Sequence, residues 1–445
     1  MTQHTRILHR SLNAQYPTAK SAKGCYIKDS QGKQYIDASG GAAVSCLGHG
    51  HDRVIGAMKA QIDRLQFIHT SFFTSDPAEE LAQRLASAAP GGKWRVFFVS
   101  GGSEATEAAL KLCRQLWVER GEAQRDHFFS RWFSYHGNTL GALSVSGNKA
   151  RRALYDPILL PRVKLAQPCH AYRHRSAGES EVEYGVRAAQ SLDFAMSEAG
   201  PQRALGFIAE TVVGATLGAA PATGGYFKRI REVCDRHQAF FIADEVMCGM
   251  GRCGKLFAIE EEDVVPDMIT LAKGLGGGYQ AIGALLVRED LAQELERGSG
   301  AFQHGHTYIG HSVAAAAALE VQKVIEEEDL VPRVRVMGEK LKQRLDARFG
   351  AHPNVGDIRG RGLLLAIELV EDRESKHPFP VERKLWAGIK AAGLEEGLIC
   401  YPSGGTADGA RGDHVLLAPP FIVTEPQLDE IVEKLGRAMD KALER

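Results

Sequence analysis

The chain has 445 residues, 44 % of them hydrophobic, and its 54 basic and 55 acidic side chains give a formal net charge of −1. This length and composition favour a large core in two or three domains, and the balanced charge gives no support to nucleic-acid binding. No apolar run reaches the roughly 18 residues of a membrane span. Eight scattered cysteines without a Cys-x-x-Cys motif indicate reduced thiols and a cytoplasmic protein.

The N-terminal segment is expected to form an arm followed by a hairpin. Residues 1–28 contain basic but no acidic side chains, as in transit peptides, yet their polar spacing gives no clear amphipathic helix, which favours an arm on the body of the protein. The runs 25–28 and 34–37 flank a turn that contains Gly32, which predicts a hairpin. Apolar residues at helical spacing from Val54 to Leu65 predict a helix.

A strand, a small-residue turn and a helix start follow one another from residue 94. Residues 94–99 form an apolar run, Ser100-Gly101-Gly102-Ser103 is the turn, and the apolar positions from Ala105 to Leu116 mark one face of a helix. Free backbone N–H groups and the helix dipole at such a start attract anions, and glycine allows a close approach. The pattern predicts either a phosphate-binding turn or an ordinary tight connection between a strand and a helix.

The middle of the chain adds an aromatic residue before a glycine and a strand that ends in a carboxylate. Tyr135 precedes His136-Gly137, and an aromatic ring there could cover a cofactor, although a packed core tyrosine explains the pattern more simply. Residues 171–204 are predicted to be mainly helical and polar. The run 207–210 is a short strand that ends at Glu210, and a helix over 225–237 follows.

Two further apolar runs, from Phe240 and from Met268, lead to the charged residues Asp244 and Lys273. Such runs are typical of buried parallel strands, whose carboxyl ends carry the ligand chemistry of open α/β sheets. A lysine there can form a Schiff base, and an aspartate can hold the protonated ring nitrogen of pyridoxal phosphate. Taken singly, each residue has a simpler explanation: a surface lysine, and an acid at a helix start.

The last part of the chain predicts a second, smaller α/β domain. A strand over 282–287 and a helix over 312–325 precede this domain, and the composition shifts after Asp329 to the basic amphipathic helix with which the domain begins. Further predicted elements are a strand at 363–369, a helix, a glycine- and serine-rich loop at 402–412, a strand at 415–417 and a final helix. The spacing of the histidines does not suit metal ligands, so no metal is expected, and these histidines are His49, His51, His304, His306 and His311.

In this order the motifs resemble those of the class III (ω-type) aminotransferases, which are pyridoxal-phosphate enzymes of fold type I. The resemblance covers nearly the whole chain and includes the interval between Asp244 and Lys273, 273 − 244 = 29 positions. The matching motifs are Ser100–Ala105, Tyr135–Gly137, Glu210, Asp244–Val246, Lys273-Gly274, Thr307-Tyr308 with Gly310-His311, and Gly412-Asp413.

The resemblance implies an α/β fold with two domains. The large domain, expected at 61–328, has a mostly parallel central sheet flanked by helices. The smaller α/β domain is expected to combine a segment at 1–60 with residues 329–445, and so to use both chain ends.

The resemblance also implies a role for each matching residue. Lys273 would bind pyridoxal 5′-phosphate as a Schiff base and then move the substrate proton, and Asp244 would pair with the ring nitrogen. Thr307 would reach the phosphate in the partner subunit, so a homodimer with shared sites, or a tetramer of such dimers, is expected. The other expected cofactor contacts are the phosphate-binding Gly101, Gly102 and Ser103, the ring-covering Tyr135 and Val246, and the adjacent His136 and Glu210.

Substrate contacts are expected at Arg411, for a carboxylate, and at Phe72. Arg411 lies in a loop whose alignment is open, so a solvent-exposed arginine is the alternative. Thr211 and Val212 follow Glu210 where many relatives have proline and glutamine, so the substrates of those relatives do not transfer directly.

The expected activity is transfer of an amino group from an ω-amino acid or amine to an α-keto acid such as pyruvate. A non-transaminating relative, namely a decarboxylase, mutase or epimerase, is the alternative. A catalytically silent binding protein is a third possibility, against which the presence of Lys273, Asp244 and the 100–103 turn together argues.

Overall fold

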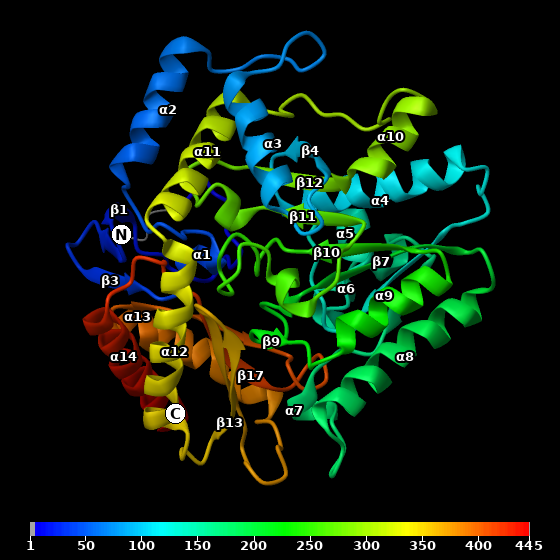
Figure 1. The fold of residues 1–445 in the computed structure, drawn as a ribbon. Coiled ribbons are helices and arrows are strands. Elements are labelled where there is room, and N and C mark those ends of the chain that lie inside the picture. The colour runs from blue at the N-terminus through cyan, green and yellow to red at the C-terminus, as the bar shows by residue number, and fades with distance from the viewer. Residues whose placement is uncertain (1–4, 445) are drawn as a thin grey trace.

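The computed structural model describes residues 5–444, and a seven-stranded sheet forms its centre (Figure 1). Five neighbouring strands run parallel, while β12 pairs antiparallel with both of its neighbours. The predicted mostly parallel sheet is therefore confirmed. In spatial order the strands are β4 (Trp94–Val99), β12 (Gly283–Arg288), β11 (Met268–Leu271), β10 (Phe240–Asp244), β7 (Ala204–Glu210), β5 (His127–Arg131) and β6 (Val163–Ala166).

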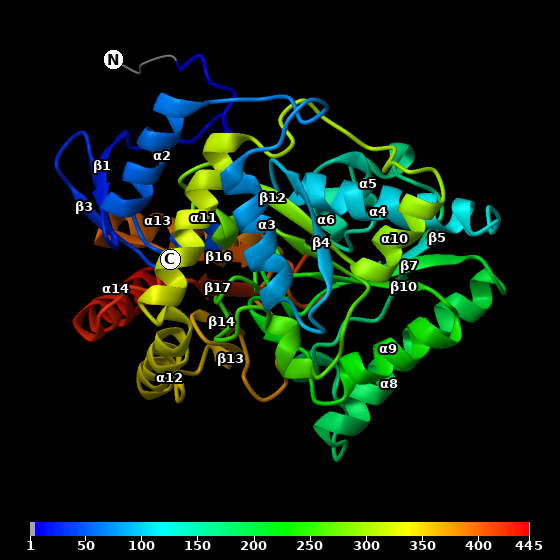
Figure 2. The same ribbon diagram turned by 45° about the horizontal axis from the view of Figure 1, so that its top comes forward.

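Helices cover both faces of this sheet because successive strand residues point to opposite sides. Phe241 and Ala243 of β10 pack into a core with α3, α8, α9 and α11, whereas Phe240 and Ile242 pack into a core with α4 and α10. Figure 2 shows α4 and α10 on one side of the sheet and α8 and α9 on the other. These helices are α3 (Asp76–Ala88), α4 (Gly102–Glu119), α8 (Glu181–Ala199), α9 (Tyr226–Arg236), α10 (Glu289–Arg297) and α11 (Ser312–Glu327).

The N-terminal strands lie beside C-terminal elements, as the blue and red ribbons at the left of Figure 1 show. The strand β15 (Leu398–Ile399) pairs with β3 (Gln34–Asp37), which continues the sheet of β1 (Ala19–Lys23) and β2 (Tyr26–Asp29). The predicted hairpin is confirmed by the antiparallel pairing of β2 with β3. The domain limits 1–60, 61–328 and 329–445 stay a prediction.

A second four-stranded sheet and three helices complete the C-terminal part, and they share one apolar core. The sheet runs β13 (Val355–Arg361), β14 (Leu364–Leu369), β17 (Asp413–Leu417), β16 (Tyr401–Gly404). The helices are α12 (Leu330–Phe349), α13 (Leu385–Glu396) and α14 (Glu425–Glu444).

The shorter elements connect these layers. The helices among them are α1 (Gly40–Ala43), α2 (Asp52–Arg64), α5 (Leu140–Ser144), α6 (Lys149–Arg152) and α7 (Ala171–His174), and the strands are β8 (Val212–Val213) and β9 (Ala220–Pro221). No helix within residues 5–444 is both long and apolar enough to cross a membrane. All eight cysteines are buried free thiols.

Two local predictions were wrong, and two strands were missed. The helical region predicted to reach residue 204 ends at Ala199. The residues from Ala204 onward belong to β7, which pairs with β5 and β10. The loop predicted at 402–412 begins as a strand, since residues 401–404 pair with β17. β5 and β6 were not predicted, because charged residues at the ends of β5 hide its apolar centre; the structure nevertheless buries Arg131 at the end of β5.

Candidate active site

The carboxyl ends of three neighbouring strands bring three ionisable side chains together. Asp244, the last residue of β10, lies opposite Glu210 of β7 and Thr270 of β11. Lys273 follows β11 by two residues and begins a short 3-10 turn with a left-handed φ of 46°. A left-handed backbone is uncommon outside glycine and often marks a functional position. The sheet edge therefore presents two carboxylates and one amine.

The carboxylate of Asp244 is fixed from two sides. Its Oδ1 accepts a hydrogen bond from the backbone N–H of Val246 at 3.0 Å, and its Oδ2 lies 2.6 Å from Nδ1 of His136. His136 is buried and is itself held by Ser130, whose hydroxyl lies 3.2 Å from Nε2. This chain of contacts keeps Asp244 in one orientation, so a partner at the sheet edge would meet a preorganised charge.

The amine of Lys273 lies in surroundings that favour its neutral form. Burial lowers the pKa of Lys273, while the negative charges of Asp244 and Glu210 oppose that shift. Neither a hydrogen bond nor an ion pair of its Nζ is present within residues 5–444. A buried amine with a lowered pKa is a better nucleophile than a surface lysine.

Glu210 is a buried acid with one unused oxygen. Its Oε1 accepts the backbone N–H of Tyr135 at 3.3 Å, whereas Oε2 has no hydrogen-bond partner and lies 3.9 Å from the Arg131 guanidinium. Burial is the largest influence and raises the pKa of Glu210 to about 7. Glu210 can therefore gain or lose a proton near neutral pH, and one of its carboxylate oxygens is free to contact a ligand at the sheet edge.

Replacing Glu210 with glutamine should stabilise the cofactor-free protein at high pH. The pKa of Glu210 rises from 4.5 to about 7 on folding, so the unfolded chain loses this proton before the folded chain does. The wild type therefore loses stability relative to Glu210→Gln between about pH 4.5 and pH 7, by about 3 kcal/mol in all. Urea midpoints at pH 4, 6 and 8 test this, with the exposed Glu198→Gln as control. A difference that does not depend on pH would contradict it.

Glu245 follows Asp244 in sequence but faces away from the edge. Its carboxylate accepts the backbone N–H groups of Ala258 at 2.7 Å and Ile259 at 2.9 Å, together with the Thr211 hydroxyl. Successive residues of an extended segment point to opposite sides. Glu245 therefore holds a turn in place, and Asp244 is the acid of the pair that reaches the site.

The start of α4 lies beside Val246, next to this edge. The first N–H groups of a helix have no acceptor within the helix, and the dipole makes them attractive to anions. A side chain at Gly102 would place its Cβ 2.8 Å from Cγ1 of Val246, so glycine is what allows this approach. The hydroxyl of Ser103 is bound to the side chain of Asn138 at 2.8 Å.

Gly102→Ala should destabilise the protein and Gly101→Ala should not. The new methyl at 102 would overlap Val246, and overpacking of this kind costs about 1–3 kcal/mol. A Cβ at Gly101 meets no atom within 4 Å, and its φ of 177° suits any residue. The thermal unfolding midpoints of the two cofactor-free variants are compared. Equal midpoints would contradict the close contact between Gly102 and Val246.

Three predicted residues lie on the surface. Phe72 is 79 % exposed, and Thr307 is also exposed. Arg411 is exposed too, and its Nε donates to Asp408 of the same loop at 2.7 Å. Within one chain the structure therefore brings Asp244, Lys273 and Glu210 together but gives Phe72, Thr307 and Arg411 no contact with them.

Arg131 is a residue of the site that the sequence analysis missed. Its guanidinium donates to the carbonyl oxygen of Glu210 and lies over the rings of Tyr226 and Phe227. Only two apolar residues, Phe128 and Phe129, precede it in β5, so no clear strand pattern in the sequence could have revealed it.

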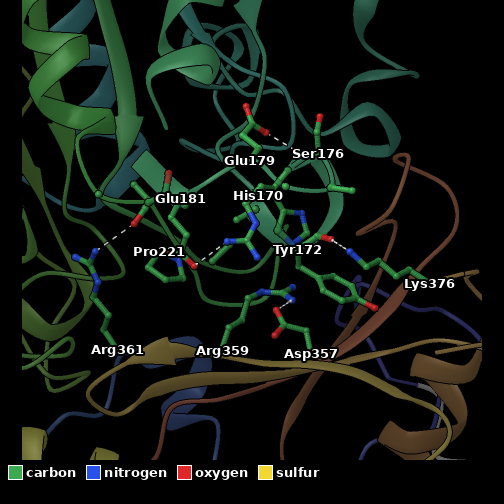
Figure 3. Close-up of a pocket in the computed structure, with 18 residues that line it drawn as sticks. His170, Tyr172, Ser176, Glu179, Glu181, Pro221, Asp357, Arg359, Arg361 and Lys376 are labelled. Atoms are coloured by element: carbon green, nitrogen blue, oxygen red, sulfur yellow. Dashed lines mark hydrogen bonds and ion pairs between the residues drawn. The ribbon is translucent and has the colours of Figure 1, made fainter. Parts of the chain in front are cut away.

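Figure 3 shows a separate polar cavity of about 770 Å³ between β13 and the segment that contains α7. Its four cations already have partners: Arg359 pairs with Asp357 at 2.8 Å, Arg361 with Glu262 at 2.7 Å and Arg175 with Glu181 at 3.6 Å, and Lys376 donates to the carbonyl oxygen of Tyr172 at 2.8 Å. None of the predicted site residues lines it. This cavity is therefore a polar gap between β13 and the segment that contains α7, apart from the candidate active site.

No group of three or more His, Cys, Asp or Glu side chains within residues 5–444 is arranged to hold a metal ion. His304 is paired with Lys111, and His306 lies 3.6 Å from Glu104 of α4. His49 lies 3.2 Å from Asp37.

Comparison with known proteins agrees with this geometry. Residues 9–439 match the family described as aminotransferase class-III. The chain belongs to the class-III aminotransferases. It is 43 % identical to an uncharacterized aminotransferase of Schizosaccharomyces pombe, over 97 % of this chain and 94 % of that protein. A putrescine–pyruvate aminotransferase of Pseudomonas aeruginosa is 34 % identical, over 94 % and 90 % respectively.

A solved structure of the ω-transaminase from Pseudomonas jessenii in complex with PMP superimposes on this class-III aminotransferase with a TM-score of 0.90. That protein is 36 % identical, over 96 % of this chain and 93 % of its own. The expected fold of type I and the assignment as a transaminase are confirmed. Class-III aminotransferases use pyridoxal 5′-phosphate, whose amine form is PMP.

The edge of the sheet fits this cofactor. It offers an anchored carboxylate for the ring nitrogen at Asp244, a buried amine at Lys273 and a helix start for the phosphate at Gly102. Because Gly102 has no side chain, the start of α4 can lie directly against Val246 at this edge.

Proposed function

We propose that this class-III aminotransferase moves an amino group from an ω-amino acid or amine to an α-keto acid such as pyruvate, with Lys273 as the cofactor-binding amine. The observation that carries the proposal is the buried Lys273, whose pKa is lowered and whose amine lies in the field of Asp244 at the same sheet edge. Similarity to a putrescine–pyruvate aminotransferase and to a γ-aminobutyrate transaminase of Solanum lycopersicum supports this substrate class.

Each side chain has a distinct part in this proposal. Asp244 holds the proton at the ring nitrogen, because an anchored carboxylate stabilises a neighbouring cation. Lys273 would carry the cofactor and, once released from it, would move the proton from the substrate Cα to the cofactor carbon C4′. When bound, pyridoxal 5′-phosphate supplies the carbonyl carbon and the electron-withdrawing ring. Tyr135 and Val246 enclose the ring, and the start of α4 with Gly101, Gly102 and Ser103 binds the phosphate.

The donor half-reaction tests the proposal. Purified enzyme loaded with the cofactor is mixed with one amine at a time, without keto acid, and the absorbance of the cofactor is followed. Conversion to the amine form by ω-amino acids or amines, reversed by pyruvate, is the expected result. Release of carbon dioxide, or an isomerised donor without the amine form, would instead indicate the decarboxylase, mutase or epimerase alternative. Absence of any cofactor band would indicate a binding protein.

We also propose a homodimer with shared sites. The exposed aromatic residues Phe72, Phe73 and Tyr308 lie on two adjoining segments, since Phe67 contacts the ring of Tyr308 with 5.6 Å between ring centroids. Exposed aromatic clusters of this kind mark protein interfaces. Thr307 lies on the same surface, in position to serve a second copy, and Phe72 would border that copy's substrate pocket.

Mixing two inactive variants should restore activity. Lys273→Ala and a bulky variant, Thr307→Phe, each damage a different part of a shared site. A mixed dimer then holds one pocket with both defects and one intact pocket, so about half of the wild-type activity per dimer is expected. Mixed dimers confirmed by mass that show no activity, or a Thr307→Phe homodimer that is fully active, would contradict the shared site.

The free, buried cysteines support the further proposal of a cytoplasmic location, because disulfides are rare in reducing compartments.

A further inference from the structure

The short helix α6 carries an arginine close to the proposed site. The side chain of Asn148 caps this helix by accepting the backbone N–H of Arg151. The guanidinium of Arg151 lies over the ring of Tyr135, with 4.3 Å between Cζ and the ring centroid. Its positive charge also contributes, after burial, to lowering the pKa of Lys273. Arg151 therefore lies within electrostatic range of the reacting amine.

The neighbouring cations are engaged, whereas Arg151 is not. Lys149 donates to the carbonyl oxygen of Asp408 at 3.0 Å, and Arg152 donates to the carbonyl oxygen of Ser146 at 2.9 Å. Arg411, the carboxylate-binding candidate from the sequence, is bound to Asp408. Within residues 5–444, no hydrogen bond or ion pair involves the guanidinium of Arg151. Its donors therefore remain free for a ligand.

We propose that Arg151 binds the carboxylate of an ω-amino-acid donor, an inference that rests on the transaminase function proposed above. A guanidinium offers a planar pair of donors that matches a carboxylate, and the contact with the ring of Tyr135 places this one beside the proposed site. The amino group of such a donor would reach the cofactor carbon held by Lys273 and displace the lysine from it, while the far end of the donor meets Arg151. A diamine would instead bring a second ammonium against this arginine, so like charges would disfavour it.

The experiment compares donors of equal length that differ only at the far end. Single-turnover half-reactions with 4-aminobutyrate, butylamine and putrescine are followed through the absorbance of the cofactor. Arg151→Ala should weaken the apparent affinity for 4-aminobutyrate by about tenfold to a hundredfold, as expected for a lost charge-assisted hydrogen bond. Butylamine should be unaffected, putrescine should bind more tightly, and Arg151→Lys should recover part of the affinity for 4-aminobutyrate.

Lys149→Ala is the matched control, because it removes a positive charge from the same helix and should leave all three affinities unchanged. Loss of 4-aminobutyrate affinity in Arg411→Ala but not in Arg151→Ala would overturn the inference. So would an equal loss for butylamine, or a loss confined to pyruvate in the reverse half-reaction. A wild type that converts none of the donors contradicts the proposed function itself, and this inference then falls with it.

Discussion

Lys273→Ala is expected to lower transamination by about 10⁴-fold or more, because it removes both the amine that would bind the cofactor covalently and the group that would move the substrate proton. Binding of the cofactor without covalent attachment should persist through Asp244 and the start of α4. The variant should therefore lose the covalent adduct that borohydride traps in the wild type, which intact mass measures directly.

The fold should survive this change. Lys273 is partly buried, its amine makes no hydrogen bond or ion pair within residues 5–444, and alanine can adopt the same backbone conformation. Unfolding midpoints of the two cofactor-free proteins check this. Lys273→Arg keeps the positive charge but not the nucleophile, so it should be equally inactive. Near wild-type rates in either variant would refute the assignment of Lys273.

Asp244→Asn is expected to lower turnover by about 10²–10³-fold, the usual effect of removing one preorganised electrostatic group. Asparagine can still accept the N–H of Val246, so the local geometry should remain while the negative charge is lost. Cofactor binding should largely persist, and the proton at the ring nitrogen should become easier to remove. The measurement is the rate of the donor half-reaction together with the pH dependence of the cofactor spectrum.

The adjacent Glu245 provides the control. Glu245→Gln removes a charge one residue away, but that side chain is bonded to Ala258 and Ile259 and faces away from the site. It should change stability and leave the rate of the folded enzyme nearly intact, while Asp244→Glu should lose less activity than Asp244→Asn. Equal activity of the wild type and all Asp244 variants would show that Asp244 is only a buried structural acid.

The sequence by itself determined the central strands and the charged residues at their ends. β10 and β11 were predictable because each is a short apolar run in the sequence, a pattern typical of buried parallel strands. The structure confirms that both strands are buried and that they end at the sheet edge. The turn before α4 was also predictable, because Gly101 and Gly102 come directly before apolar residues at helical spacing. The resemblance of the ordered motifs then supplied the family.

Only the tertiary structure decided which arginine side chains remain free to bind a ligand. Arg411 and Arg151 are both arginines in polar segments, yet Asp408 engages the first, whereas the second lies free over Tyr135. Arg131 ends a strand that its own charge made hard to recognise, and packing against Tyr226 buries it. The residues that contact these arginines lie far apart from them in sequence or on irregular loops. No periodic pattern in the sequence predicts such contacts. Their pairing depends on distances that exist only after the chain has folded.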